Sequence, residues 1–92
     1  MKIEFDPAKS EKNNRERALP FDLAGEFDWE SAFYYEDSRA DYGETRIIAL
    51  GCIADRLHVL CFKPIAGGVR IISLRKANTR EVRYYEEEIL KH

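Results

Sequence analysis

The pattern of apolar and polar positions predicts five strands. Two are short: one alternates between polar and apolar residues at the start of the chain, and one is rich in aromatic residues. Three longer, nearly continuous apolar runs follow and are joined by short connections, which is typical of an antiparallel meander with at least one well-covered face. The predicted strands span residues 2–5, 32–35, 46–53, 56–62 and 69–74.

A first helix is predicted over residues 7–18. Asp6 followed by Pro7 is typical of an N-cap with proline in the first helical position. Residues 9–17 contain no large apolar side chain, so this helix has little to bury against a core. Two interpretations follow: the helix is held by caps and side-chain pairs, or its polar groups serve the function of the protein.

Two further helices complete the predicted fold. A short one over residues 20–27 can place Phe21, Ala24 and Phe27 against the core. Residues 78–81 have the spacing of a capping box, which opens a final helix that reaches Leu90. The order is β-α-α-β-β-β-β-α, which predicts an α+β domain whose helices pack against an antiparallel sheet.

Helical periodicity separates two adjacent tyrosines in the final helix. Tyr85 shares a stripe with Val82 and Ile89, so its ring is expected to be half-buried with the hydroxyl at the surface. Tyr84 points to the other side and is expected to be exposed. Either ring can stack on a nucleobase or donate to a phosphate, although a core role is favoured for Tyr85.

The size of the chain allows one domain, which we expect to span residues 1–92. No run of 18 apolar residues is present to span a membrane, and the first residues lack the apolar segment of a signal peptide. These features predict a cytoplasmic protein.

Charge is distributed unevenly along the chain, although the net charge is only -2. Residues 1–45 carry 12 acids and 6 bases, whereas residues 46–92 carry 9 bases and 5 acids. The second half could therefore present a basic face to an anion such as a nucleic acid. The alternative is that the opposite charges pair with one another on the surface of the fold.

Cysteine and histidine residues indicate neither a disulfide nor a metal site. In a hairpin that turns at Ala54-Asp55, Cys52 would lie opposite residue 57 or 58 rather than opposite Cys61, so a bridge is not expected. The two cysteines and two histidines, at positions 52, 58, 61 and 92, show no metal-site spacing. No cofactor is expected.

Arginines mark the ends of the predicted long strands. Strict alternation along the last strand places Arg70 on one face and Arg75 on the other, while Arg46 opens the first long strand. Because a guanidinium group matches the oxygens of a phosphate, a sheet edge lined by arginine can hold an RNA backbone. The alternative is that these residues are exposed strand ends paired with the acidic loop.

Several segments resemble the BrnT family of bacterial toxins. They cover essentially the whole chain: Lys2-Ile3-Glu4-Phe5-Asp6-Pro7-Ala8-Lys9, then Asn13, Arg15, Phe21 and Ala24, then Gly43-Glu44-Thr45-Arg46 and Ile48-Ala49-Leu50-Gly51, and finally Arg70-Ile71-Ile72-Ser73-Leu74-Arg75-Lys76-Ala77 with Arg80-Glu81 and Tyr85. The resemblance implies a fold similar to that of RelE-type toxins and an endoribonuclease that arrests translation without a metal. It also implies a BrnA-like ribbon-helix-helix antitoxin, which would contact operator DNA in a complex that represses its own operon.

The resemblance also suggests roles for particular residues. Arg46 and Arg75 are the candidates for holding the scissile phosphate, and Tyr85 occupies the tyrosine position of the family. Glu44 is either a general base or the residue that orients Arg46, and the second role is favoured. The supporting RNA-binding candidates are Arg70, Lys76, Arg17 and Arg80.

One segment departs from the family pattern. Members commonly read Lys-His-Gly at the end of the first helix, whereas this chain reads Glu16-Arg17-Ala18. A side chain that titrates near neutral pH is thereby replaced by a permanently charged one. A second hypothesis follows, in which this chain is a catalytically weakened toxin that acts mainly as an antitoxin-binding co-repressor.

Overall fold

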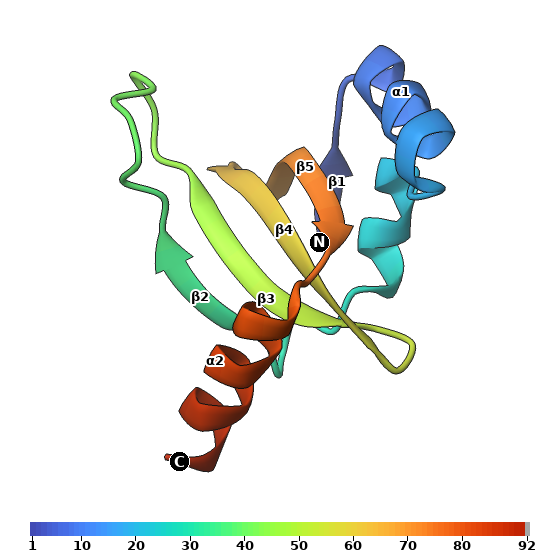
Figure 1. Ribbon diagram of the computed structural model, residues 1–92. Coiled ribbons are helices and arrows are strands. Elements are labelled where there is room, and N and C mark those ends of the chain that lie inside the picture. The colour runs from blue at the N-terminus through green and yellow to red at the C-terminus, as the bar shows by residue number, and fades with distance from the viewer. Residues whose placement is uncertain (92) are drawn as a thin grey trace.

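The computed structural model describes residues 1–91, with Leu90 described by its backbone only. A five-stranded sheet in the order β1-β5-β4-β3-β2 forms the centre (Figure 1). The predicted α+β class is confirmed. The elements are β1 (Lys2–Glu4), α1 (Pro7–Arg17), the 3-10 helix η1 (Phe21–Glu26), β2 (Phe33–Glu36), β3 (Ile47–Ile53), β4 (Arg56–Ile65), β5 (Gly68–Lys76) and α2 (Thr79–Leu90).

Two features differ from the predicted architecture. Strand β1 pairs with β5 in parallel, so only β2 to β5 form an antiparallel meander. This close pairing requires a glycine at position 68, because a Cβ atom there would collide with the carbonyl group of Lys2. The second helix is a 3-10 helix: it has only six residues, and Gly25 within them has low helix propensity.

Each face of the sheet carries its own core cluster. On one face, η1 packs its buried Phe21 and Ala24 against the sheet, as predicted, and Leu60 and Leu74 are fully buried there. On the other face, α2 packs Val82 and Tyr85 against a second cluster, which is formed by residues of β3 and β4 together with Ala77. Figure 1 shows α2 at one end of this second face and α1 beyond the opposite edge of the sheet.

A bulge in β5 changes which residues share a face. Ser73 pairs with Cys61 and Ile71 pairs with Phe62, so Ile72 is an extra residue in β5. Ile71 and Leu74 consequently face the same core cluster. The predicted separation of Arg70 from Arg75 is therefore wrong: the extra residue brings both arginines to the face that α2 partly covers.

The β3–β4 hairpin has the expected register at its cysteines. Cys52 pairs with Leu57 and Cys61 with Ile48, and both thiols are free. Among residues 1–91, no group of three or more His, Cys, Asp or Glu side chains is placed to hold a metal ion. His92, one of the four residues considered for metal binding, lies outside that range. In the same range, no helix is long and apolar enough to cross a membrane.

Candidate functional site

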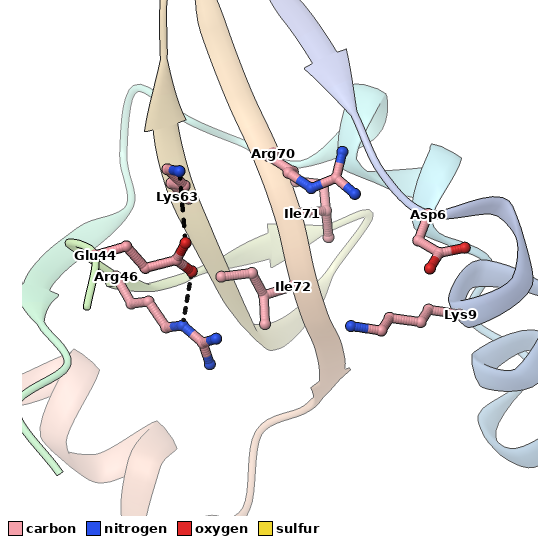
Figure 2. A pocket seen from close by; sticks show the side chains of 8 residues that line it. All are labelled: Asp6, Lys9, Glu44, Arg46, Lys63, Arg70, Ile71 and Ile72. Carbon is pink, nitrogen blue, oxygen red and sulfur yellow. Dashed lines mark hydrogen bonds and ion pairs between the residues drawn. The ribbon is translucent and has the colours of Figure 1, made fainter. Parts of the chain in front are cut away.

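A polar hollow of about 160 Å³ lies where three parts of the chain meet (Figure 2). The loop before β3 supplies Glu44 and Arg46, and the paired strands β4 and β5 supply Lys63 and Arg70. Lys9 reaches from α1 toward Ile72, on the other side of β5 from Glu44. The remaining lining residues are Asp6, Ile71 and Ile72.

Glu44 organises the cations of this hollow. Its carboxylate accepts a hydrogen bond from Arg46 Nε at 3.1 Å and lies 3.4 Å from Lys63 Nζ. The hydrogen bond from Arg46, together with the Lys63 ammonium, holds the pKa of Glu44 below its usual value although partial desolvation opposes this. Glu44 is therefore ionised at neutral pH, and its charge directs both cations into the hollow.

Arg46 keeps part of its guanidinium group available for a ligand. The group lies over the ring of Tyr42, 4.0 Å from the ring centroid, in a cation–π contact. Within residues 1–91, its only side-chain hydrogen bond is the one from Nε to Glu44. The two terminal nitrogens can therefore bind an anion without breaking a bond within the protein.

Asp37 holds the loop that carries Glu44 and Arg46. This buried carboxylate accepts two 2.8 Å hydrogen bonds from Arg39 and one of 3.3 Å from the Tyr42 hydroxyl, and its backbone N–H donates to the carbonyl of Arg46. The Arg39 hydrogen bonds lower the pKa of Asp37 to about 2, despite burial. Asp37 thus supports Arg46 through Tyr42 and through the backbone, a role that the sequence pattern did not reveal.

Helix α1 is attached to the fold by buried polar side chains. Asn13 Nδ2 donates to the carbonyls of Leu19, at 2.7 Å, and Leu74, at 2.9 Å, while Ser10 Oγ accepts from the N–H of Phe21 at 2.8 Å. Asp6 caps the first turn, as predicted. The helix therefore needs no large apolar residue, and the lysines and arginines on its remaining surface stay exposed.

Two further hollows extend the first one along α1 and β5. The second shares Lys9 and Ile72 with the first, and the third shares Arg17 with the second. We call these three hollows together the groove. Its cations are Lys9, Lys12, Arg17, Arg46, Lys63, Arg70, Arg75 and Lys76, against the three carboxylates Asp6, Glu16 and Glu44. The groove is thus strongly basic in a protein whose net charge is -2.

Arg75 borders the groove but is engaged in an ion pair. Its two terminal nitrogens donate to the Glu81 carboxylate at 2.9 and 2.7 Å. Glu81 is also the acidic member of the predicted capping box with Asn78, which the structure confirms. The hydrogen bonds from Arg75 hold the pKa of Glu81 below its usual value. Arg75 therefore ties the start of α2 to β5.

The structure brings most of the predicted site residues into the groove. Glu44, Arg46 and Arg70 lie together in the first hollow, and Arg17, Arg75 and Lys76 lie together in the third. Arg80 and Tyr85 do not line any of the three hollows. Arg80 lies beside Tyr84 at the start of α2.

Tyr85 occupies a packing position. Its ring packs against the cluster between α2 and the sheet, and its hydroxyl donates to the carbonyl of Ser31 at 3.1 Å. The expected half-burial of Tyr85 and exposure of Tyr84 are both confirmed.

Sequence reasoning singled out Lys76 but not the other three lysines of the groove, Lys9, Lys12 and Lys63. Lys63 pairs directly with Arg70 across β4 and β5. The short connection between β4 and β5 allows the register of this hairpin to be predicted, and that register places Lys63 beside Arg70. Lys9 and Lys12 could not be assigned to the groove without knowing which side of α1 faces the sheet.

A concave surface with this excess of cations suits a polyanion such as RNA. Residues 5–81 match a protein family described as "Ribonuclease toxin, BrnT, of type II toxin-antitoxin system". The chain therefore belongs to the BrnT family of ribonuclease toxins. The match contains all groove residues from Asp6 to Lys76, whereas Tyr85 lies beyond its end. Comparison with curated proteins gives no match.

Proposed function

We propose that this protein cleaves RNA in the groove and thereby arrests translation, as the toxin of a type II toxin–antitoxin pair. The observation that carries the proposal is the first hollow, where Glu44 directs Arg46 and Lys63 toward one space within the segment that matches the toxin family. We further propose that residues 1–92 form one domain with a fold of the RelE type.

The proposed reaction uses the RNA itself as the nucleophile. The 2′-hydroxyl gives its proton to water and attacks the adjacent phosphate, which forms a 2′,3′-cyclic phosphate. The bond to the 5′-oxygen of the next nucleotide breaks, and this oxygen takes a proton from water. Negative charge develops on the phosphate oxygens during the attack. The terminal nitrogens of Arg46, with Lys63 and Arg70, stabilise that charge, so no metal ion is required. Arg70 is available for this role because, within residues 1–91, its side chain pairs only with Glu4, at 3.3 Å in an exposed ion pair that contributes little.

Glu44 acts as a positioning residue in this proposal. A general base works best when its pKa lies near the working pH, whereas the pKa of Glu44 lies below its ordinary value. Its two ion pairs instead fix Arg46 and Lys63 in the arrangement that meets the phosphate. The role favoured from sequence, that Glu44 orients Arg46, is therefore the one we propose.

The other predicted residues form the RNA-binding surface. We propose that Arg17 and Lys76 contact the RNA backbone at the far end of the groove, and that Arg80 contacts it beside α2. Arg75 supports this end through Glu81 rather than by holding the scissile phosphate, because both of its terminal nitrogens are already engaged.

A type II toxin implies an antitoxin partner. We propose that this partner is a BrnA-like ribbon-helix-helix protein and that the toxin–antitoxin hetero-oligomer represses its own operon in the cytoplasm. Operator DNA would be contacted by the antitoxin alone.

A second candidate function is that of an antitoxin-binding co-repressor with weak cleavage. One observation favours it: the ionisable side chains of the groove are all Lys, Arg, Asp or Glu, and none titrates near neutral pH in its ordinary state. Arg17 stands where the family pattern has histidine, and it donates to Asn13 Oδ1 at 3.3 Å. Binding of RNA would then survive where turnover is slow.

Incubation of the purified protein with RNA, with and without EDTA, tests both candidates. We expect cleavage that survives EDTA and that falls about 100- to 1000-fold in Arg46→Ala, because one charge-stabilising donor is lost. Arg15→Ala is the control: Arg15 is likewise an arginine paired with a glutamate, but it is exposed and lies outside the groove.

Three outcomes would contradict the main proposal. Loss of cleavage in EDTA would overturn the metal-free mechanism, and equal effects of the two arginine variants would overturn the assigned site. Intact RNA together with tight antitoxin binding would favour the co-repressor.

A further inference from the structure

A hollow of about 300 Å³ lies between β2 and the first turns of α2. It is separate from the groove and is lined by Tyr35, Leu50, Arg80, Glu81 and Tyr84. Its volume is that of a pocket for a small ligand or for one part of a larger one. Nothing in the proposed reaction uses it.

The two tyrosines of this hollow present aromatic surface to solvent. Tyr35 is 40% exposed and Tyr84 is 42% exposed, although both are large and partly apolar. Phe33 packs against both rings: its ring centroid lies 6.2 Å from that of Tyr35 and 5.4 Å from that of Tyr84. The hollow therefore offers two supported aromatic rings above the buried side chain of Leu50, which suits a flat aromatic ligand.

The hollow is connected to the groove through one ion pair. Glu81 lines the hollow and binds Arg75, which borders the third hollow of the groove. Burial raises the pKa of Tyr35, as do Glu81 and Tyr84, while the charges of Arg39 and Arg75 lower it. Of these two arginines, Arg75 is the one that borders the groove.

We propose that the Tyr35–Tyr84 hollow binds a nucleobase of single-stranded RNA whose backbone lies in the groove. The inference rests on the proposed function and specifies its substrate. Bases of a duplex are stacked on one another, so only an unpaired base can enter between aromatic side chains. Arg80, at the rim, supplies a guanidinium group for the adjacent phosphate or for an edge of the base.

Aromatic side chains next to a basic groove favour RNA over an antitoxin segment as the occupant. Arg80 and Glu81 line this hollow, and Arg83 and Glu87 join Arg80 and Tyr84 around the neighbouring one, so the net positive charge comes from the groove. Aromatic rings interleaved with cations beside a basic groove are the arrangement found in proteins that bind single-stranded nucleic acid. A purely apolar face, which an amphipathic helix of a partner would require, is not formed by these residues.

A double-mutant cycle between protein and RNA tests the proposal. The probe is a hexanucleotide with methylated 2′-hydroxyls, which cannot be cleaved, and its binding to the full-length protein is measured by fluorescence anisotropy. One base at a time is replaced by an abasic residue. At one position we expect affinity for the wild type to fall about tenfold, which corresponds to the loss of one base–aromatic stack.

Tyr84→Leu should lower the affinity for the intact oligonucleotide by the same factor of about ten. Its affinity for the abasic oligonucleotide should be no lower than its affinity for the intact one. Tyr84→Phe keeps the ring and should bind like the wild type. Tyr35→Leu provides a second variant on a different element, and circular dichroism confirms that each variant is folded.

The outcomes separate this inference from the proposed function. Affinity that falls in Arg46→Ala but is unchanged in Tyr84→Leu and with every abasic probe would overturn the nucleobase site alone. A wild type without affinity for the oligonucleotide would overturn both. If Tyr84→Leu leaves RNA binding unchanged but weakens the antitoxin complex, the hollow belongs to the antitoxin interface and the inference is wrong.

Discussion

The groove lies between two walls that present cations in different ways. The helix wall is α1, with Lys9, Lys12 and Arg17 on its surface, and the loop wall is the segment 37–46, which carries Glu44 and Arg46. Each wall is anchored by a buried polar side chain rather than by a large apolar one. The helix wall uses Asn13, a neutral amide, whereas the loop wall uses Asp37, a charged carboxylate.

The two anchors differ in what they bind. Asn13 donates to two main-chain carbonyls, which cannot titrate or rotate away. The Asp37 carboxylate accepts from the side chains of Arg39 and Tyr42 in addition to the backbone N–H of Arg39, and Tyr42 in turn lies beneath Arg46. The helix wall should therefore keep its position at any pH at which the protein is folded, whereas acid should loosen the loop wall.

Replacement of the helix anchor should have the largest effect. Asn13→Ala leaves the buried carbonyls of Leu19 and Leu74 without their donor, so we expect a loss of about 3 kcal/mol in the free energy of unfolding. Asn14→Ala is the matched control, because Asn14 is exposed on the same helix and its replacement should change stability by less than about 0.5 kcal/mol. Urea unfolding measures both, and similar values for the two variants would contradict the assigned anchor.

This anchor also shows where prediction from sequence ends. The strands, the capping box at Asn78 and the Asp6 cap are local patterns, and the structure confirms them. Asn13 lies in a segment that is polar throughout, so the hydrophobic pattern does not distinguish it from Asn14. The family resemblance includes Asn13 but assigns it no structural role. Its burial depends on contacts with the carbonyl of Leu74, 61 residues away.

The bulge at Ile72 is also non-local, because it depends on how β5 pairs with β4. Strict alternation therefore separated Arg70 from Arg75, which the structure places on one face. The candidate cations were nevertheless largely found, since arginines at strand ends and the family resemblance both pointed to them. The sequence did not predict the ion pair between Arg75 and Glu81.

Replacement of the loop anchor should have a smaller effect that depends on pH. The pKa of Asp37 is about 2 in the folded protein, against an ordinary value of 3.8. A lowered pKa means that the ionised group stabilises the fold above about pH 4, and that this contribution is lost as pH falls toward 2. Asp37→Asn should therefore lower the free energy of unfolding by about 1 to 2 kcal/mol at pH 7 and by only a small fraction of that at pH 2, where the wild-type carboxyl group is itself half protonated.

Urea unfolding between pH 2 and pH 7 measures the difference in the free energy of unfolding between the wild type and Asp37→Asn. The control is Asp41→Asn, a change to an exposed carboxylate of the same loop, which should retain the pH dependence of the wild type. An unchanged pH dependence in Asp37→Asn would show that the loop wall is held in some other way.

A third change lies outside both walls and should affect stability only. Tyr85→Phe removes one hydrogen bond, to the carbonyl of Ser31, while the ring keeps its packing, so we expect a loss of about 0.5 to 1 kcal/mol. The rate of RNA cleavage should be unchanged when measured at a temperature where both proteins are folded. A large loss of cleavage with normal stability would instead support the catalytic role that the family resemblance suggested for Tyr85.

The smallest change separates the tasks of the two walls. Lys12 lies on the helix wall, away from the hollow that holds Arg46, so Lys12→Ala should weaken RNA binding without changing the rate of cleavage at saturating RNA. Loss of one phosphate contact should reduce the slope of log affinity against log salt concentration by about 0.7 for single-stranded RNA. Lys63→Ala should reduce this slope by the same amount and should also slow cleavage, because Lys63 contacts Glu44. Arg15→Ala, a change outside the groove, should leave both quantities unchanged. If Lys12→Ala also leaves RNA affinity and its salt dependence unchanged, the helix wall does not contact RNA, and the binding surface is confined to the loop wall and the sheet.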